Sequence, residues 1–293
     1  MTTFVQYVID ALSLGSLYAL FALGIALIFG VMQLANFAHG ELIMAGGYSL
    51  VVLGSTAWPV KLLVTCLVVV LLALAMERAA FRPLRGSNPA TLLVASFALS
   101  YGLQSIAAVL FSTTPRSTNL TTTLSQSLQL GSIAVPKLDI VTVAVVVGLL
   151  VGLALFMSRT RTGVEMRAAA ENFRMARLLG VRANVVIAVA FAISGLLAAV
   201  ASMLIVTQTG QVATTMGTTA VLVGFIAAVV GGMGSLPGAV IGGYLLGALS
   251  VALQASLPLG LRPFRDAFLF STVFVLLIVR PEGLVAQRAV VRV

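Results

Sequence analysis

The stretch VIDALSLGSLYALFALGIALIF, residues 8–29, decides the fold class of this chain. It is almost entirely apolar, and a helix of roughly 20 such residues crosses the hydrocarbon core of a membrane. The composition agrees, because 60% of the residues are hydrophobic and 9% are charged, against roughly 25% charged residues in soluble domains. A soluble enzyme, a disordered chain and a disulfide-stabilised secreted protein are therefore excluded. The sequence predicts an all-α, polytopic transmembrane helical bundle.

Nine hydrophobic segments are predicted along the chain, which we treat as a single transmembrane domain of residues 1–293. The number of spans is eight if residues 37–53 are re-entrant, because this segment is short and carries Glu41. The remaining segments are residues 8–29, 61–76, 90–111, 138–157, 185–206, 218–230, 239–257 and 267–279. The Ser/Thr-rich stretch at residues 112–136 is predicted to be a polar extracytoplasmic loop.

The distribution of the basic residues predicts the orientation. The formal net charge is +9, and 12 of the 17 lysines and arginines lie in residues 78–85, residues 158–184 and the tail from residue 280. The positive-inside rule places these segments, and with them the C-terminus, in the cytoplasm. The N-terminus is then outside with nine spans and inside with eight. The basic residues expected outside are Lys61, Arg116, Lys137, Arg262 and Arg265.

The chain carries few side chains with which to do chemistry. It has one Cys and one His, which excludes a disulfide framework and predicts no metal site, no catalytic triad and no cofactor. The glycine-rich stretch at residues 231–238 lacks the Gly-Lys-Ser/Thr ending of a phosphate-binding loop, so we expect no Walker-type ATP site. No nucleic-acid partner is expected, because aromatic side chains are not interleaved with the basic ones. The chain is predicted not to be a self-contained enzyme.

The polar stretch at residues 158–184 predicts a short amphipathic helix on the cytoplasmic surface. Arg167, Glu171 and Arg174 are spaced i, i+4 and i+7, so they share one face and support each other as ion pairs. Gly180 is placed to end the helix. The opposite, apolar face is expected to contain Ala168, Met175, Leu178 and Leu179. Two roles stay open, docking of a protein partner and contact with anionic membrane lipid.

Polar groups near the hydrocarbon mark a second feature, Asn36-Phe37-Ala38-His39-Gly40-Glu41. Such groups are costly in a membrane unless they are buried or hydrated, so they suggest a function. The alternative is a structural turn at the cytoplasmic interface, with Asn36 capping the next helix.

The glycine-rich stretch at residues 231–238 is the third feature, and it predicts an interruption between two apolar helices. Gly242, Gly243 and Gly247 after it are expected to let helices approach closely. Broken helices often border transport pathways, although ordinary packing is the commoner cause. The candidate pathway residues from both features are Asn36, His39, Glu41, Gly231, Gly232, Gly234, Ser235 and Gly238.

Four stretches resemble one known family. They are GSLYALFALGIALIFGVMQLANFAHGELIMAGGY at residues 15–48, RAAAENFRMARLLGV at 167–181, FIAAVVGGMGSLPGAVIGG at 225–243 and VRPEGL at 279–284. Together they resemble the permease subunits of bacterial branched-chain amino-acid ABC importers, of the LivH type. The chain departs from that pattern at Val223, where the family often has a lysine, and at Gly46-Gly47-Tyr48. These departures bear on the substrate more than on the class of transporter.

The resemblance implies a multi-pass protein of the bacterial inner membrane that takes up leucine, isoleucine and valine. The implied partners are a homologous permease in a heterodimer, two cytoplasmic ATP-binding subunits and a periplasmic substrate-binding protein. The residues implied to couple the permease to the ATPases are Arg167, Glu171, Arg174, Arg177 and Gly180. Alternative interpretations are an importer of the same class for urea or short amides, a secondary transporter without an ATPase, and a membrane scaffold for a soluble enzyme.

Overall fold

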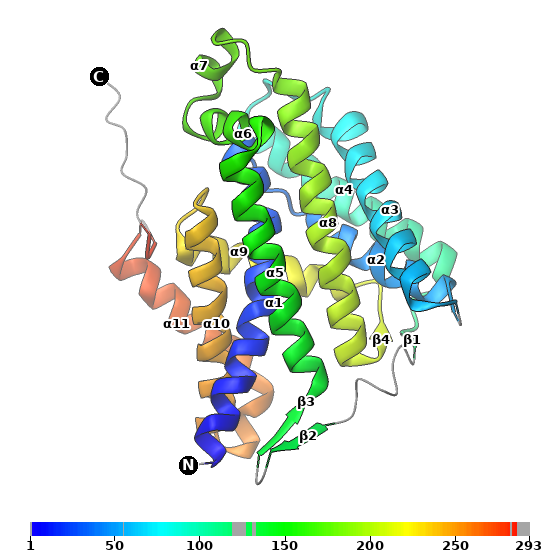
Figure 1. Ribbon diagram of the computed structural model, residues 1–293, viewed down its shortest axis with the longest axis vertical. Coiled ribbons are helices and arrows are strands. Elements are labelled where there is room, and N and C mark those ends of the chain that lie inside the picture. The colour runs from blue at the N-terminus through cyan, green and yellow to red at the C-terminus, as the bar shows by residue number, and fades with distance from the viewer. Residues whose placement is uncertain (1, 55, 119–126, 131–132, 282, 286–293) are drawn as a thin grey trace.

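The computed structural model describes residues 2–54, 56–118, 127–130, 133–281 and 283–285, and it is a bundle of helices (Figure 1). Every predicted hydrophobic segment is helical in it. The corresponding helices are α1 (Thr2–Met32), α2 (His39–Val52), α3 (Trp58–Met76), α4 (Pro89–Phe111), α5 (Lys137–Arg159), α8 (Ala183–Thr209), α9 (Met216–Gly231), α10 (Leu236–Ser256) and α11 (Arg265–Val279). The remaining helical elements are η1 (Glu77–Phe81), α6 (Arg161–Glu171), α7 (Phe173–Leu178) and η2 (Leu259–Phe264).

Within these described residues, six helices are long and apolar enough to cross a membrane, namely α1, α3, α4, α5, α8 and α10. The helices α2, α9 and α11 have 14, 16 and 15 residues and are shorter than a full span. The predicted polytopic all-α bundle is thereby confirmed, while the number of eight or nine spans stays a prediction.

Two short strand pairs were not predicted. In one, β1 (Arg116–Ser117) pairs antiparallel with β4 (Gln211–Val212), and in the other β2 (Ser127–Leu130) pairs with β3 (Ile133–Pro136). The stretch at residues 112–136 is therefore not wholly a loop, and its residues 119–126 and 131–132 lie outside the described part. Strands of two to four residues show too little alternation of apolar and polar residues to be recognised in a sequence.

The helix α1 is the central helix of the bundle, because it packs against α5, α8, α9 and α10. Its residues are apolar around the whole circumference, which is typical of a helix buried on all sides, and Ala19, Ala22 and Ile28 are fully buried. By contrast α3, α4 and α5 leave most of their apolar side chains exposed at the periphery, as expected of helices that face lipid.

Close approach of α1 and α10 depends on glycine, as predicted. A Cβ added at Gly247 would lie 2.3 Å from Cα of Gly15, and one added at Gly243 would lie 2.3 Å from the backbone nitrogen of Ala19. Gly242 faces α9 in the same manner, at 2.0 Å from the carbonyl oxygen of Ala227. Small residues at helix contacts are the usual way in which membrane helices maximise packing.

The glycine-rich stretch interrupts the chain between α9 and α10, also as predicted. The backbone turns through positive φ at Gly232 (106°) and Gly234 (86°), and Ser235 then caps α10 by accepting a 3.1 Å hydrogen bond from the Gly238 amide. The chain returns to this turn near its end. The amide of Leu284 donates to the carbonyl of Val230 at 2.7 Å, and that of Val285 donates to Gly231 at 3.2 Å.

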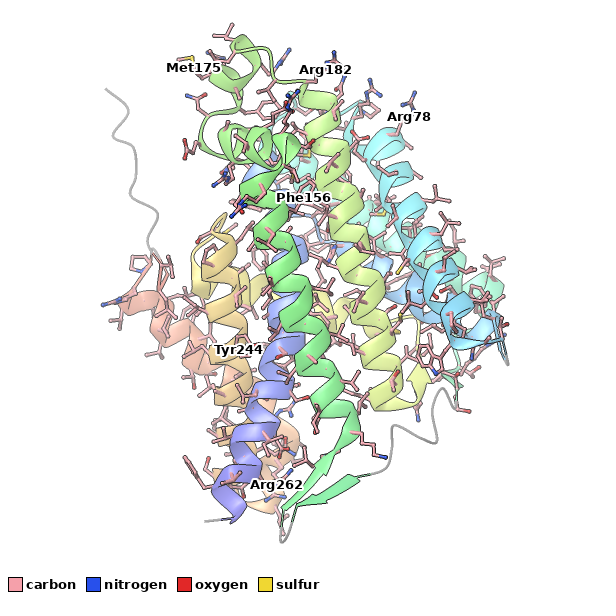
Figure 2. The ribbon with its side chains drawn as sticks, viewed as in Figure 1. Arg78, Phe156, Met175, Arg182, Tyr244 and Arg262 are labelled. Carbon is pink, nitrogen blue, oxygen red and sulfur yellow. The ribbon has the colours of Figure 1, made fainter. Side chains whose placement is uncertain are left out.

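The charged ends of the bundle differ. Lys61 lies in the first turn of α3 and Arg78 lies two residues after its end, in η1, so these two side chains mark opposite ends. Figure 2 shows Arg78, Met175 and Arg182 at one end and Arg262 at the other. We call the first the arginine-rich end, since it carries Arg78, Arg82, Arg85 and the six arginines of residues 158–184. Arg288 and Arg292, which the sequence predicts to be cytoplasmic, lie outside the described residues.

Candidate functional site

A cavity of about 2730 Å³ lies at the arginine-rich end of the bundle. Its walls are formed by the second half of α1, by α5, α6 and α7, and by the first residues of α8 and α10. Two predicted groups of residues meet here. The candidate residues on its lining are Arg167, Glu171, Arg174, Arg177, Gly234 and Ser235. The structure therefore brings four of the five coupling candidates together with part of the glycine-rich turn. The candidates that are not part of this lining are Gly180, Asn36, His39, Glu41, Gly231, Gly232 and Gly238.

The polar stretch at residues 158–184 folds as two helices, so the prediction of a single amphipathic helix was wrong. Thr160 caps α6 by accepting a hydrogen bond from the Gly163 amide at 3.0 Å. Asn172 then leaves the helical region (φ −153°, ψ 95°), and its side chain accepts from the Met175 amide at 3.0 Å. An asparagine favours the N-cap of a new helix over a helix interior. The stripe of Arg167, Glu171 and Arg174 is consequently split between α6 and α7.

The apolar face of this region also differs from the predicted one. The side chains that pack on the bundle are those of Met166, Ala169 and Ala176, which are buried. The exposed fractions of Met175, Leu178 and Leu179 are 55%, 77% and 80%. We call these three exposed residues the α7 patch, and Figure 2 shows one of them, Met175, at the tip of the arginine-rich end.

Gly180 ends α7 as predicted. Its φ of 89° lies in the region that favours glycine. The Gly180 amide donates a hydrogen bond to the Arg177 carbonyl, and the Val181 amide donates one to the Ala176 carbonyl, both at 3.1 Å. These two bonds form the helix ending known as the Schellman motif. Gly180 therefore fixes the end of α7, and the α7 patch immediately before it is held in a defined conformation.

Arg85 links two further elements at this end. In the sequence, this arginine indicates only the orientation in the membrane and does not suggest such a role. Its guanidinium forms an ion pair with Glu77 in η1 and donates a hydrogen bond to Asn184 in the first turn of α8. Partial burial lowers the pKa of Arg85, and the Glu77 carboxylate opposes that shift. The spacing of 99 residues between Arg85 and Asn184 leaves no local signal of the contact.

His39 joins three helices in the core. Its Nδ1 lies 3.0 Å from Oγ of Ser194 on α8, and that hydroxyl donates to the carbonyl of Gly24 on α1 at 3.0 Å. Because the single hydroxyl proton goes to Gly24, the imidazole Nδ1–H donates to Ser194. A Cβ at Gly24 would lie 2.4 Å from Nε2 of His39, so the ring fills the space that glycine leaves. This geometry favours the structural interpretation of His39.

Replacing Ser194 with alanine tests this interpretation. The change leaves the His39 Nδ1–H buried without its partner and removes the side-chain hydrogen bond to the Gly24 carbonyl, and an unpaired buried polar group costs roughly 1–3 kcal/mol. We expect a clear fall in the midpoint of thermal unfolding in detergent. Ser105→Ala on α4 is the control, because this exposed hydroxyl bonds only the Tyr101 carbonyl of its own helix among the described contacts. Equal midpoints for the two variants would contradict a structural role of the His39 contact.

Asn36 closes the turn before α2 and does not cap that helix. Its Oδ1 accepts a 3.1 Å hydrogen bond from the amide of Ala38, the residue at the N-cap position of α2. The side chain is buried, and its Nδ2 has no partner among the described residues. The capping role considered for Asn36 is therefore wrong, because the N-cap position of α2 lies two residues later, at Ala38.

Glu41 anchors a polar network that connects α2, α4 and α9. Its Oε1 accepts hydrogen bonds from Ser100 Oγ at 2.7 Å and from Gln104 Nε2 at 2.8 Å. The same Nε2 donates to Thr218 Oγ1 at 2.8 Å. None of these three partners was predicted from the sequence. The available signal was the spacing of Ser100 and Gln104, which puts two polar side chains on one face of an otherwise apolar helix.

Neither a metal nor a phosphate group finds a prepared site in the described part of the chain. No group of three or more His, Cys, Asp and Glu side chains lies together there. In the glycine-rich turn, the amides of Gly232, Ser235 and Gly238 are bonded within the turn itself, to Val229, Gly232 and Ser235. They do not form the free amide cradle of a phosphate-binding loop.

The chain is similar to permease proteins over its whole length. A family model described as the permease component of the branched-chain amino acid transport system matches residues 7–279. The chain is 33% identical to the high-affinity branched-chain amino acid transport system permease protein BraD of Pseudomonas aeruginosa, covering 99% of this chain and 98% of BraD. It is 32% identical, with the same coverage, to the LivH permease proteins of Salmonella typhimurium and Escherichia coli K12. No solved structure matches the chain.

Proposed function

The chain belongs to the family of permease components of branched-chain amino acid transport systems, and we propose that it is one membrane-spanning subunit of an ABC importer for leucine, isoleucine and valine. The observation that carries this proposal is the match to BraD and LivH over nearly the full length of all three chains. The partners are a homologous permease, two cytoplasmic ATP-binding subunits and a periplasmic substrate-binding protein. ATP is hydrolysed on the partner chains, and this subunit is not catalytic.

In the proposed topology the arginine-rich end faces the cytoplasm of a bacterial inner membrane. The short helices α2, α9 and α11 count as crossings, so that nine segments alternate and the N-terminus lies outside. The distribution of basic residues supports this orientation. A single lysine lies at the start of α3 and of α5 (Lys61 and Lys137), whereas three arginines lie in residues 78–85 after α3 and six in residues 158–184 from the end of α5 onward. The C-terminal tail is then cytoplasmic.

The ATP-binding subunits dock on α6 and α7 in this proposal. The α7 patch offers apolar side chains to a groove on the partner, and Arg174 and Arg177 beside it offer charge. The coupling element has two parts and not one rigid rod, because the chain bends at Asn172. Movement of α7 reaches the bundle through the buried side chain of Ala176 and through α6, which contacts α1, α5 and α8.

The cavity at the arginine-rich end then serves as the cytoplasmic half of the pathway. Gly234 and Ser235 lie on its wall, and the coupling residues Arg167 and Glu171 lie on the same cavity. ATP-driven closure of the ATPases changes the width of this cavity and alternates access between the two sides of the membrane. Asn36, His39 and Glu41, with the turn from Gly231 to Gly238, are the proposed elements around which the pathway opens.

Uptake by the reconstituted complex tests the proposed function. Proteoliposomes with this permease, its partner permease, the ATPases and the binding protein are expected to accumulate leucine only when ATP is inside. Urea and acetamide serve as competing substrates. Uptake of urea in place of leucine would assign the chain to the alternative substrate class, and leucine uptake that persists without the ATPases would identify a secondary transporter.

A further inference from the structure

The two carboxylate oxygens of Glu41 differ, because one accepts hydrogen bonds and the other has no partner among the described residues. The residue is 1% exposed, Oε1 accepts two hydrogen bonds, and Oε2 is buried without a partner among the described residues. The ion pairs found among those residues are Arg85–Glu77 and Arg265–Asp266, so no cation is paired with Glu41. An acid in a membrane bundle is expected to be matched by a cation or by several donors. Glu41 is therefore able to accept a further donor.

We propose that Glu41 receives the ammonium group of the transported amino acid, and that Gln104 occupies this position while the site is empty. This inference rests on the proposed function and names the substrate contact within it. The amide of Gln104 donates both of its protons, one to Glu41 Oε1 and one to Thr218 Oγ1. An ammonium group has three protons in a tetrahedral arrangement. It can replace the amide at both acceptors and also reach the vacant Oε2.

Three phenylalanines form an apolar cluster beyond the Glu41 network, on the side toward which the aliphatic part of the substrate would point. The ring of Phe37, just before α2, stacks on Phe97 of α4 at 4.3 Å between centroids and lies 5.2 Å from Phe225 of α9. Phe97 and Phe225 belong to two of the helices that carry the Glu41 network, and Phe37 lies two residues before the third. Phe97 precedes Gln104 by seven residues and Phe225 follows Thr218 by seven, which corresponds to about 10 Å along each helix.

The direction from the polar network to the phenylalanines follows from the helices. In α9 the chain runs from Thr218 past Phe225 to the glycine-rich turn, whose Gly234 lines the cavity at the arginine-rich end. The ammonium contact therefore lies deeper and the aromatic contact lies nearer to that cavity. A leucine with its amino group on Glu41 and its side chain toward the rings would point to the proposed cytoplasmic exit.

One strip on the surface of these helices is polar, beside the apolar side chains that α4 exposes elsewhere. Thr218 and Thr219 of α9 are exposed, as is Thr215 just before it, and Ser100 and Gln104 of α4 are partly exposed beside them. Hydroxyl and amide groups are expensive in hydrocarbon, so they normally face a bundle interior or a hydrated space. This strip therefore faces a hydrated space in the assembled importer, and Glu41 lies directly behind it.

Uptake by a Glu41→Gln variant is the first test. Glutamine keeps the size of the side chain and removes its charge, so the complex should assemble in the normal amount. Leucine uptake by the reconstituted importer is expected to fall at least tenfold. Uptake within twofold of wild type would overturn the inference while leaving the proposed function intact. Absence of leucine uptake by the wild-type importer would instead overturn the proposed function, and the inference with it.

Protection of a cysteine tests the contact without transport. The single native thiol is replaced (Cys66→Ser), and Thr218→Cys is labelled with a cationic methanethiosulfonate in the purified complex without binding protein. Leucine is expected to slow labelling at least fivefold. The analogue 4-methylpentanoate, which has the same carbon skeleton and no ammonium group, should not. Adding Glu41→Gln should remove the protection by leucine.

The matched control is Ser105→Cys in the same background. Ser105 follows Gln104 on α4, is exposed, and bonds the Tyr101 carbonyl, so leucine should not protect it. Protection of both cysteines would indicate a general conformational effect and would overturn the inference. Equal protection of Thr218→Cys by 4-methylpentanoate, or protection that persists with Glu41→Gln, would overturn it as well.

Discussion

Replacing Leu178 and Leu179 together by aspartate is expected to abolish recovery of the ATP-binding subunits when the permease is purified from cells. The exposed fractions of these side chains are 77% and 80%, so the substitutions bury no charge in the bundle itself. In a docked complex the same positions become the centre of an apolar contact. Truncation of such central contacts typically costs 2 kcal/mol or more, and a charge placed there adds the cost of its burial. We expect at least a thirtyfold loss of bound ATPase.

Leu259→Asp is the matched control for the docking prediction. Leu259 is 79% exposed in η2, beside Arg262 at the opposite end of the bundle, so the type of substitution and the exposure match, with one leucine replaced in place of two, while the location differs. Charge reversal at Arg174 and Arg177 is expected to weaken recovery less, because exposed ion pairs contribute roughly 0–1 kcal/mol each. Full recovery of a stimulated complex with the Leu178 and Leu179 variant would show that the ATPases dock elsewhere.

Gly247→Ala is expected to have the largest effect on the stability of the permease. The added Cβ would lie 2.3 Å from Cα of Gly15, which is well inside van der Waals contact, and the opposing atom belongs to backbone that cannot rotate away. α1 and α10 would have to separate along the most extensive helix contact of the bundle. Overpacking of this kind costs about 1–3 kcal/mol, and the rigid backbone on both sides points to the upper end of that range.

The control for this prediction is the same substitution on α5. A Cβ at Gly152 meets no atom within 4 Å, so Gly152→Ala should leave packing unchanged and should favour the helix by about 1 kcal/mol. Unfolding midpoints measured in one detergent are expected to fall for Gly247→Ala and to stay or rise for Gly152→Ala. Similar midpoints for both variants would mean that the contact of α1 with α10 is looser than described.

The helices were predictable because a membrane imposes strong rules on length and polarity. Every apolar run became a helix, and the glycine-rich turn and the cap at Gly180 lie where the sequence indicated. The break at Asn172 was missed, since charge spacing across it fits one continuous helix. Which side chains of α7 are buried depends on where Ala176 meets the bundle. That direction is set by tertiary contacts and has no local signature.

The sequence identified the candidate residues but not the side chains that they contact. Glu41 and His39 stood out because a polar group in an apolar segment needs a reason, and both are buried and hydrogen bonded. Their partners lie far along the chain, with Ser194 155 residues from His39 and Gln104 63 residues from Glu41. Local periodicity contains no information at such distances. The structure therefore supplied the observations that distinguish His39, which joins helices, from Glu41, which keeps one oxygen unpaired among the described residues.

The hydrogen bonds of Leu284 and Val285 to α9 have a practical consequence for making the protein. They hold residues 284–285 against the carbonyls of Val230 and Gly231, and Gly283 packs on Gly232 in the same turn. A protease site or a shortened terminus placed after α11 but before Gly283 would strip these carbonyls of their donors and open the turn. Expression vectors should therefore carry affinity tags downstream of Val285, and end-trimming to aid crystallisation should stop there.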